Sequence, residues 1–290
     1  MPSNLWGYRS LSDDKKFLVY DDEVSEQAKE AWDKLADWYS ARKKGSYEFK
    51  IQLPAILNLL GDLHGKSLLD IGCGPCVYSV EFAKKGADVF GVDISQKILK
   101  KARNNVEIAD VKLALMEADA HSLPCKDSSF DVIVLILTIL NPKMLKEAAR
   151  VLKPEGILLF SDTHPVIEAK RRWESDAIDS PIIIEDYFLQ DKREWQIKHG
   201  SGQTVTLKYC TRTIEQCVDM IADEGFKILR IVEPKPGKYV KESDPLHYGR
   251  CSRIPYFIIY LAEKPRPGFD PGTCCLRGSR STRLSHRGTV

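Results

Sequence analysis

The sequence predicts an α/β fold built on a mainly parallel, seven-stranded sheet with helices on both faces. From Lys66 onward, short apolar runs rich in β-branched residues alternate with stretches of helical periodicity, which is typical of repeated strand–helix–strand units. The run Val132-Ile-Val-Leu-Ile is apolar throughout, as expected of a strand that is covered on both faces. An N-terminal helical cap and an antiparallel insertion after the fifth strand complete the predicted architecture.

The N-terminal cap is assigned to residues 1–60. Between residues 23 and 42 the apolar side chains recur at helical spacing and form one stripe, which predicts a first helix. A second helix is predicted from residue 47 to residue 60, ending before Gly61.

The central domain is assigned to residues 61–264. Its first five strands are predicted at residues 67–71, 88–92, 111–116, 131–137 and 156–160, with helices at 76–85, 95–105 and 143–152. A further helix is predicted at residues 213–223, before Gly225. Residues 227–233 and 255–261 are then interpreted as the last two strands, an antiparallel pair at the sheet edge.

Residues 163–210 break this alternation and predict the antiparallel insertion. Aromatic and β-branched stretches surround Gly200 and Gly202, which favours a hairpin there. We expect the insertion to cover the substrate, with Tyr187, Phe188 and Trp195 as walls. The alternative is that these rings form a small core of the insertion itself.

The tail, residues 265–290, contains Gly, Pro, Ser, Thr and Arg without apolar periodicity, so we expect it to be disordered. Its sequence can be back-translated into the reverse complement of a tRNA gene, which suggests the hypothesis that the reading frame runs into such a gene. The alternative is a basic tail that binds nucleic acid.

Charge and composition argue against several classes of partner. The net charge is +2, but the tail holds five arginines and one aspartate, so the rest of the chain carries about −2, which does not favour nucleic acid. No apolar run is as long as a membrane span, and no leader pattern opens the chain, so we expect neither membrane insertion nor secretion. Eight irregularly spaced cysteines favour a reducing cytoplasm. Cys73 and Cys76 lack a second pair at zinc-finger spacing, so no metal is expected.

The most informative motif is the segment that runs from Leu68 to Cys76, Leu-Leu-Asp-Ile-Gly-Cys-Gly-Pro-Cys. A buried strand ends in Asp70, and Gly72 and Gly74 then allow a tight turn and a close approach of the backbone to a ligand. The following helix offers unpaired N–H groups to a ligand carboxylate. A nicotinamide-dependent reductase would need a glycine at position 77, where this chain has Val77.

Two acidic residues follow in the order expected of a nucleotide site. Asp93 ends the second predicted strand about twenty residues after the glycines, where a carboxylate can accept both ribose hydroxyls. Asp119 and Ala120 follow the third strand. Each acid taken singly is equally well explained as a helix cap or turn former, but the set in register points to a nucleotide-like ligand.

At these residues the chain resembles class I S-adenosylmethionine-dependent methyltransferases, in particular the small-molecule group called the type 11 methyltransferase domain. The resemblance covers residues 30–162 well and the C-terminal third loosely, and it implies a Rossmann-like fold. It further implies that Asp70, Gly72 and Gly74 hold the methionine part of the cofactor, that Asp93 binds ribose, and that Asp119 and Ala120 contact adenine. The family usually has a third glycine where this chain has Cys76.

The resemblance implies methyl transfer to a small-molecule acceptor, and it leaves O-, C- and N-methylation open, as well as the oligomeric state. His164, just past the fifth strand, is our candidate for the base that a hydroxyl or carbon acceptor needs, with a capping or packing role as the alternative. Thr138-Ile-Leu-Asn141 differs from the motif of enzymes that methylate nucleic-acid amines. A regulatory module that binds S-adenosylmethionine without catalysis is the alternative function.

Overall fold

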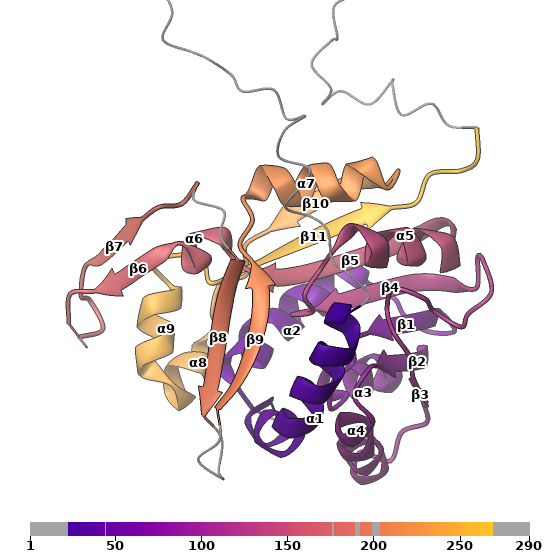
Figure 1. Cartoon of the computed structure of the whole chain (residues 1–290), viewed down its shortest axis with the longest axis horizontal. Coiled ribbons are helices and arrows are strands. Elements are labelled where there is room, and N and C mark those ends of the chain that lie inside the picture. Colours follow the sequence, from indigo (N-terminus) through magenta and orange to yellow (C-terminus); the bar gives the residue numbers. More distant parts are fainter. Residues whose placement is uncertain (1–22, 44, 176, 189–191, 199–203, 269–290) are drawn as a thin grey trace, which may run out of the picture.

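The structure is a computed structural model that describes residues 23–43, 45–175, 177–188, 192–198 and 204–268. Its centre is one seven-stranded sheet with the order β10-β11-β5-β4-β1-β2-β3 (Figure 1). The strands are β1 (Ser67–Ile71), β2 (Asp88–Asp93), β3 (Ala114–Glu117), β4 (Phe130–Ile136), β5 (Leu152–Thr163), β10 (Lys227–Val232) and β11 (Phe257–Glu263). Neighbours from β3 to β5 are parallel, whereas β11 is antiparallel to both β5 and β10, so the predicted mainly parallel sheet is confirmed.

Four helices lie along the sheet faces: α3 (Val77–Lys84), α4 (Gln96–Ile108), α5 (Pro142–Val151) and α7 (Ile214–Asp223). Successive residues of one strand belong to different cores: Leu69 of β1 packs in a cluster with α5 and α7, and Leu68 in a cluster with α3. The same alternation continues along β4, β5 and β11. Helices therefore cover both faces of the sheet, as the sequence predicts. The carboxyl ends of the strands are where a ligand site forms in open sheets of this kind.

The two predicted N-terminal helices are present, as α1 (Glu23–Lys43) and α2 (Tyr47–Leu60). Ser46 caps α2 by accepting a hydrogen bond from the Phe49 N–H. Residues 1–22 of the predicted cap lie outside the described residues.

The insertion after β5 contains α6 (Pro165–Glu168) and two antiparallel pairs, β6 (Lys170–Trp173) with β7 (Ile182–Glu185) and β8 (Lys192–Lys198) with β9 (Thr204–Cys210). Leu35 of α1 packs with Ile197 and Leu207 of the second pair. The cap and the insertion therefore share one small core and lie together over the sheet edge (Figure 1). The turn predicted near Gly200 and Gly202 lies outside the described residues.

The last two strands form the predicted antiparallel pair at one edge of the sheet, with β10 outermost and β11 between β10 and β5. The connection between them forms two short helices that the sequence did not predict, α8 (Lys238–Ser243) and α9 (Pro245–Cys251). Buried Val240 and Cys251 of these helices pack with Ile51 of α2, so tertiary contacts stabilise segments whose local pattern is too short to predict a helix.

The predicted disordered tail is described as far as residue 268, and residues 269–290 lie outside the described residues. Arg266, at the start of this tail, forms an ion pair of 2.8 Å with Glu155. In the described part of the chain, no helix combines the length and the apolar character needed to cross a membrane.

Candidate active site

The glycine turn between β1 and α3 is shaped by its two glycines. Gly72 and Gly74 have φ angles of +71° and +54°, a backbone region that side chains disfavour. A Cβ atom on Gly72 would lie 2.6 Å from Oγ1 of Thr138, whereas one on Gly74 would lie 3.4 Å from the nearest atom of Tyr39. Gly72 is therefore required both by conformation and by the close approach of the end of β4.

Asp70 lies behind this turn and is not among the described residues that line a cavity. Its carboxylate accepts a hydrogen bond from the Ser79 hydroxyl of α3, and burial raises its pKa to about 7. Asp70 therefore joins the end of β1 to α3.

Asp93, at the end of β2, holds the glycine turn in place by hydrogen bonds. Its two carboxylate oxygens accept hydrogen bonds from the Gly74 N–H at 3.0 Å and the Ser95 N–H at 2.9 Å. Burial raises the pKa of Asp93, and the two N–H donors oppose that shift because they stabilise the charged form. A carboxylate with about four lone-pair sites can hold these donors and still accept a ligand hydroxyl.

Asp119 belongs to a short polar chain after β3. Nδ1 of His121 lies 2.6 Å from Oδ1 of Asp119, and Nε2 of His121 lies 2.7 Å from Nδ2 of Asn141. Asn141 accepts from the Met144 N–H through Oδ1, so its amide donates to Nε2. Nε2 of His121 then accepts from Asn141, and Nδ1 donates to Asp119. This chain fixes Asp119 between β3 and α5.

These groups surround a first cavity of about 130 Å³, which we call the cofactor cavity. Its lining includes five of the residues predicted from the sequence: Gly72, Gly74, Asp93, Asp119 and Ala120. Trp32 and Tyr39 of α1 also line it. The structure thus brings together residues from the ends of three neighbouring strands, under a wall that the N-terminal helix supplies.

Cys76 stands where the resemblance leads us to expect a third glycine, and its backbone explains that expectation. Its φ angle is +61°, in the left-handed region, and it occupies the position before α3. The Cys76 side chain is fully buried and packs with Cys73, Leu99 and Ala102, so it points away from the cofactor cavity. The described residues contain no group of side chains suited to a metal ion, at this CxxC or elsewhere.

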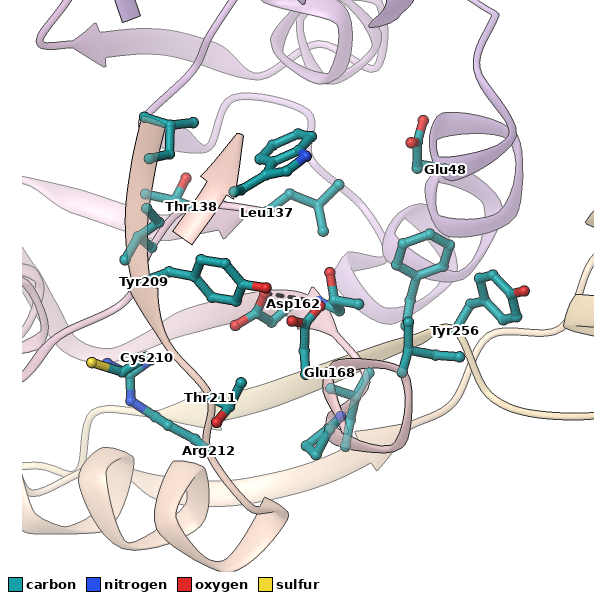
Figure 2. A pocket seen from close by; sticks show the side chains of 18 of the residues that line it. Glu48, Leu137, Thr138, Asp162, Glu168, Tyr209, Cys210, Thr211, Arg212 and Tyr256 are labelled. Carbon is teal, nitrogen blue, oxygen red and sulfur yellow. Dashed lines mark hydrogen bonds between the residues drawn. The ribbon is translucent and has the colours of Figure 1, made fainter. Parts of the chain in front are cut away.

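A second, larger cavity of about 420 Å³ adjoins the first, and we call it the acceptor cavity. Both cavities are lined by Trp32, Tyr39, Leu137, Thr138 and Ile139. The acceptor cavity lies over the ends of β4 and β5, between α1, the insertion and β11 (Figure 2). Its eight aromatic lining residues are Trp32, Trp38, Tyr39, Tyr47, Trp195, Tyr209, Tyr256 and Phe257.

The sequence did not predict the charged residues that line the acceptor cavity. They are Glu48 of α2, Asp162 of β5, Glu168 of α6 and Arg212 after β9. Figure 2 shows Asp162 and Glu168 at the centre, with the Tyr209 ring pointing toward them from β9. Asp162 carried a usable signal, since an acid at the carboxyl end of a central strand is a candidate for the same reason that led to His164.

His164 is not among the described residues that line either cavity. It is buried and precedes α6, where Nδ1 accepts the Val166 N–H at 3.1 Å. Nε2 lies 3.0 Å from Oε1 of Glu233. Both ring nitrogens therefore have protein partners, which is the geometry of the capping role that the sequence left open and not that of a base facing an acceptor.

Of the three aromatic residues predicted as walls of the substrate site, only one lines the acceptor cavity in the structure. Trp195 lines the acceptor cavity and meets Trp38 edge-on with ring centroids 6.1 Å apart. Tyr187 and Phe188 pack against each other, at 5.0 Å between centroids, and are not among the described lining residues. Phe188 is 80% exposed, so it forms neither a wall nor a core.

Comparison with known proteins agrees with this geometry. Residues 68–156 match a family described as a methyltransferase domain. The chain is 35% identical to the demethylmenaquinone methyltransferase of Tropheryma whipplei over 117 residues, 38% of this chain and 48% of that protein. It is 36% identical to the ubiquinone biosynthesis O-methyltransferase of Coxiella burnetii over 103 residues, 34% of this chain and 44% of that protein. The chain thus spans less than half the length of either relative.

Among solved structures, an S-adenosylmethionine-dependent methyltransferase from Mesorhizobium loti has the same fold. The TM-score is 0.60 at 24% identity, over 76% of this chain and 99% of that one. The strand order and the glycine turn define a Rossmann-like domain. The matched segment and this fold make the chain similar to S-adenosylmethionine-dependent methyltransferases.

Proposed function

We propose that this protein transfers the methyl group of S-adenosylmethionine to a small-molecule acceptor held in the acceptor cavity. The observation that carries the proposal is the junction of the two cavities at Leu137, Thr138 and Ile139. A ligand in each cavity would meet its neighbour at the end of β4. Methyl transfer is an in-line displacement, for which such alignment can supply about 7–11 kcal/mol.

The groups that line the cofactor cavity support this proposal. We assign the backbone of Gly72 and Gly74 to the methionine part, because the turn offers a close approach and leads into the N-terminus of α3. Asp93 is assigned to the ribose hydroxyls, and Asp119 with Ala120 to adenine. Asp70 is assigned a supporting role through Ser79.

The acceptor cavity has the size and surroundings of a small-molecule site. A volume of about 420 Å³ is within the range of ligand pockets, about 300–1,000 Å³. Both relatives above are named for quinones, which are small molecules. The near-neutral charge of residues 1–264 favours such an acceptor over nucleic acid.

Replacing Asp93 with alanine tests the cofactor assignment. The change should weaken binding of S-adenosylhomocysteine roughly ten- to hundredfold, since charge-assisted hydrogen bonds contribute about 1.5–3 kcal/mol. Isothermal calorimetry measures this, and Asp88→Ala is the matched control, because Asp88 is exposed at the opposite end of β2. Equal affinity in the two variants would refute the ribose assignment.

Catalysis is tested by incubating the full chain with isotopically labelled S-adenosylmethionine and a small-molecule extract. We expect labelled methyl groups in a product that mass spectrometry can identify. Tight cofactor binding without any labelled product would favour the regulatory module instead.

A further inference from the structure

The floor of the acceptor cavity is acidic. Asp162 and Glu168 lie together at its centre and Glu48 lies on the α2 side, whereas Arg212 is the one cation among the described lining residues (Figure 2). Such a lining disfavours an acceptor with a carboxylate or phosphate, because the added negative charge would face three carboxylates across a low-dielectric space. It favours an acceptor that enters with a positive charge.

The walls point to the same kind of ligand. The eight aromatic side chains come from α1, α2, the insertion and β11, so rings face the cavity from several directions. The faces of indole and phenol rings attract organic cations within about 6 Å by about 0.5–2 kcal/mol. Three of these rings are indoles, those of Trp32, Trp38 and Trp195, which bind cations best.

Asp162 is placed to handle a proton in this cavity. Its main-chain neighbour Thr163 donates an N–H to Oδ1 at 2.8 Å, and the remaining oxygen has no protein hydrogen-bond partner among the contacts described. Burial raises the pKa of Asp162 to about 7, against the lowering by that N–H and by Arg212. Such a carboxylate is a better proton acceptor near neutral pH than an ordinary one.

We propose that the acceptor is an organic amine that enters as an ammonium ion, and that Asp162 removes its proton before methyl transfer. This inference rests on the proposed function. The ammonium donates one proton to the Asp162 carboxylate and becomes a neutral amine. Its lone pair then attacks the methyl carbon, a C–N bond forms as the C–S bond breaks, and the electron pair of that bond remains on sulfur. The products are a methylated ammonium and S-adenosylhomocysteine, and Asp162 releases the proton to solvent.

The first test measures binding without turnover. Choline and 3,3-dimethylbutan-1-ol have the same shape and differ in charge, and neither offers a nitrogen that can be methylated. We expect tryptophan fluorescence to report choline binding at least tenfold tighter than binding of the alcohol. Asp162→Asn and Glu168→Gln should each reduce that preference severalfold, and Glu107→Gln, an exposed change on α4 away from both cavities, should not. Equal affinity for the two probes, or no binding of either at millimolar concentration, would overturn the inference.

The second test uses turnover. A small-molecule extract is divided by ion exchange into cationic, neutral and anionic fractions, and each is incubated with isotopically labelled S-adenosylmethionine. We expect label in an N-methylated product of the cationic fraction. A labelled ether, ester or carbon-methylated product overturns this inference and leaves the proposed function standing, whereas no product in any fraction overturns both.

The Asp162→Asn variant then isolates the base. With the amine so identified, kcat should fall by about 10²–10⁴. In the wild type, kcat/KM should fall as the pH drops below about 7, where Asp162 becomes protonated in the presence of Glu168, Arg212, Cys217 and Tyr260 around it. A variant that folds, as its melting temperature shows, and that keeps both the rate and this acid limb would refute the role of Asp162.

Discussion

The two cavities that meet at Thr138 are built from different material. The cofactor cavity takes its shape from backbone at positive φ, at Gly72 and Gly74, and from the Asp93 carboxylate, which two backbone N–H groups hold in place. The acceptor cavity is built from side chains, most of them on α1, α2 and the insertion. The residues of the cofactor cavity lie at the ends of three adjacent strands. The acceptor cavity is formed by elements that are distant in the chain.

This difference determines how each half should respond to substitution. A cavity that is shaped by backbone has little room to adjust. One added methyl group at the wrong position should therefore cause a large loss of stability and of cofactor affinity. The acceptor cavity is lined by eight aromatic rings, so removing one of them should reduce the affinity for the acceptor only moderately.

The largest effect is expected at Gly72. Gly72→Ala adds a Cβ atom 2.6 Å from Oγ1 of Thr138 at a φ angle of +71°, which combines overpacking of about 1–3 kcal/mol with left-handed strain of about 1–2 kcal/mol. We expect a loss of about 2–5 kcal/mol in the free energy of unfolding and loss of measurable cofactor binding. Gly74→Ala, with 3.4 Å of room, should cost the strain alone, about 1–2 kcal/mol. Urea unfolding and calorimetry measure both.

Adding Thr138→Ala to Gly72→Ala separates the two causes. It removes the contacts at 2.6 and 2.9 Å and leaves one at 3.3 Å, so it should restore the overpacking part and not the strain. No restoration in the double variant would show that backbone conformation alone explains the glycine.

The same contrast explains what could be predicted from the sequence. The strand order, both faces of the sheet and five cofactor-cavity residues follow from local patterns, since Gly72, Asp93 and Asp119 each stand at the end of a strand that its own composition predicts. Glu48, Glu168 and Arg212 follow from no local pattern. They lie on α2, on α6 and after β9, so they line one cavity only because elements distant in the chain pack together.

Trp195→Ala tests the side-chain half. Removing this lining ring should raise the KM of the acceptor about three- to tenfold, because a contact between an indole ring and a cation contributes about 0.5–2 kcal/mol. Cofactor affinity should not change, as Trp195 is not among the lining residues described for that cavity. Phe188→Ala, in the same insertion but exposed, is the control. A loss of cofactor binding would show that the two halves are not independent.

Cys76 tests the backbone half with a smaller effect. Because its φ angle is +61°, Cys76→Gly should be about 1–2 kcal/mol more stable than Cys76→Ala, although both lose the buried thiol. This ordering is the reverse of that expected at an ordinary helical position. Thermal unfolding of the two variants measures the difference, and equal stability would mean that the loop relaxes to another conformation.

The smallest effect on turnover is expected at His164, which lies outside both cavities. His164→Ala should lower the free energy of unfolding by about 0.5–2 kcal/mol, because the Val166 N–H loses its cap. Burial lowers the pKa of His164 below its usual 6.5, while Glu233 opposes that shift. The neutral ring therefore stabilises the fold above about pH 6.5, and that contribution is lost as the pH falls, since the unfolded chain takes up the proton first. His164→Ala should flatten this part of the pH–stability curve.

Turnover distinguishes the capping role of His164 from the catalytic role that its position in the sequence suggests. With Nδ1 accepting from Val166 and Nε2 paired with Glu233, the ring has no nitrogen directed at an acceptor. His164→Ala should therefore leave kcat within about threefold of the wild type, far from the loss of about 10²–10⁴ that follows removal of a positioned base. His164→Asn, whose side-chain oxygen can still cap α6, should recover most of the stability. A hundredfold loss of kcat in both variants, with cofactor affinity unchanged, would instead establish His164 as the base and displace Asp162 from that role.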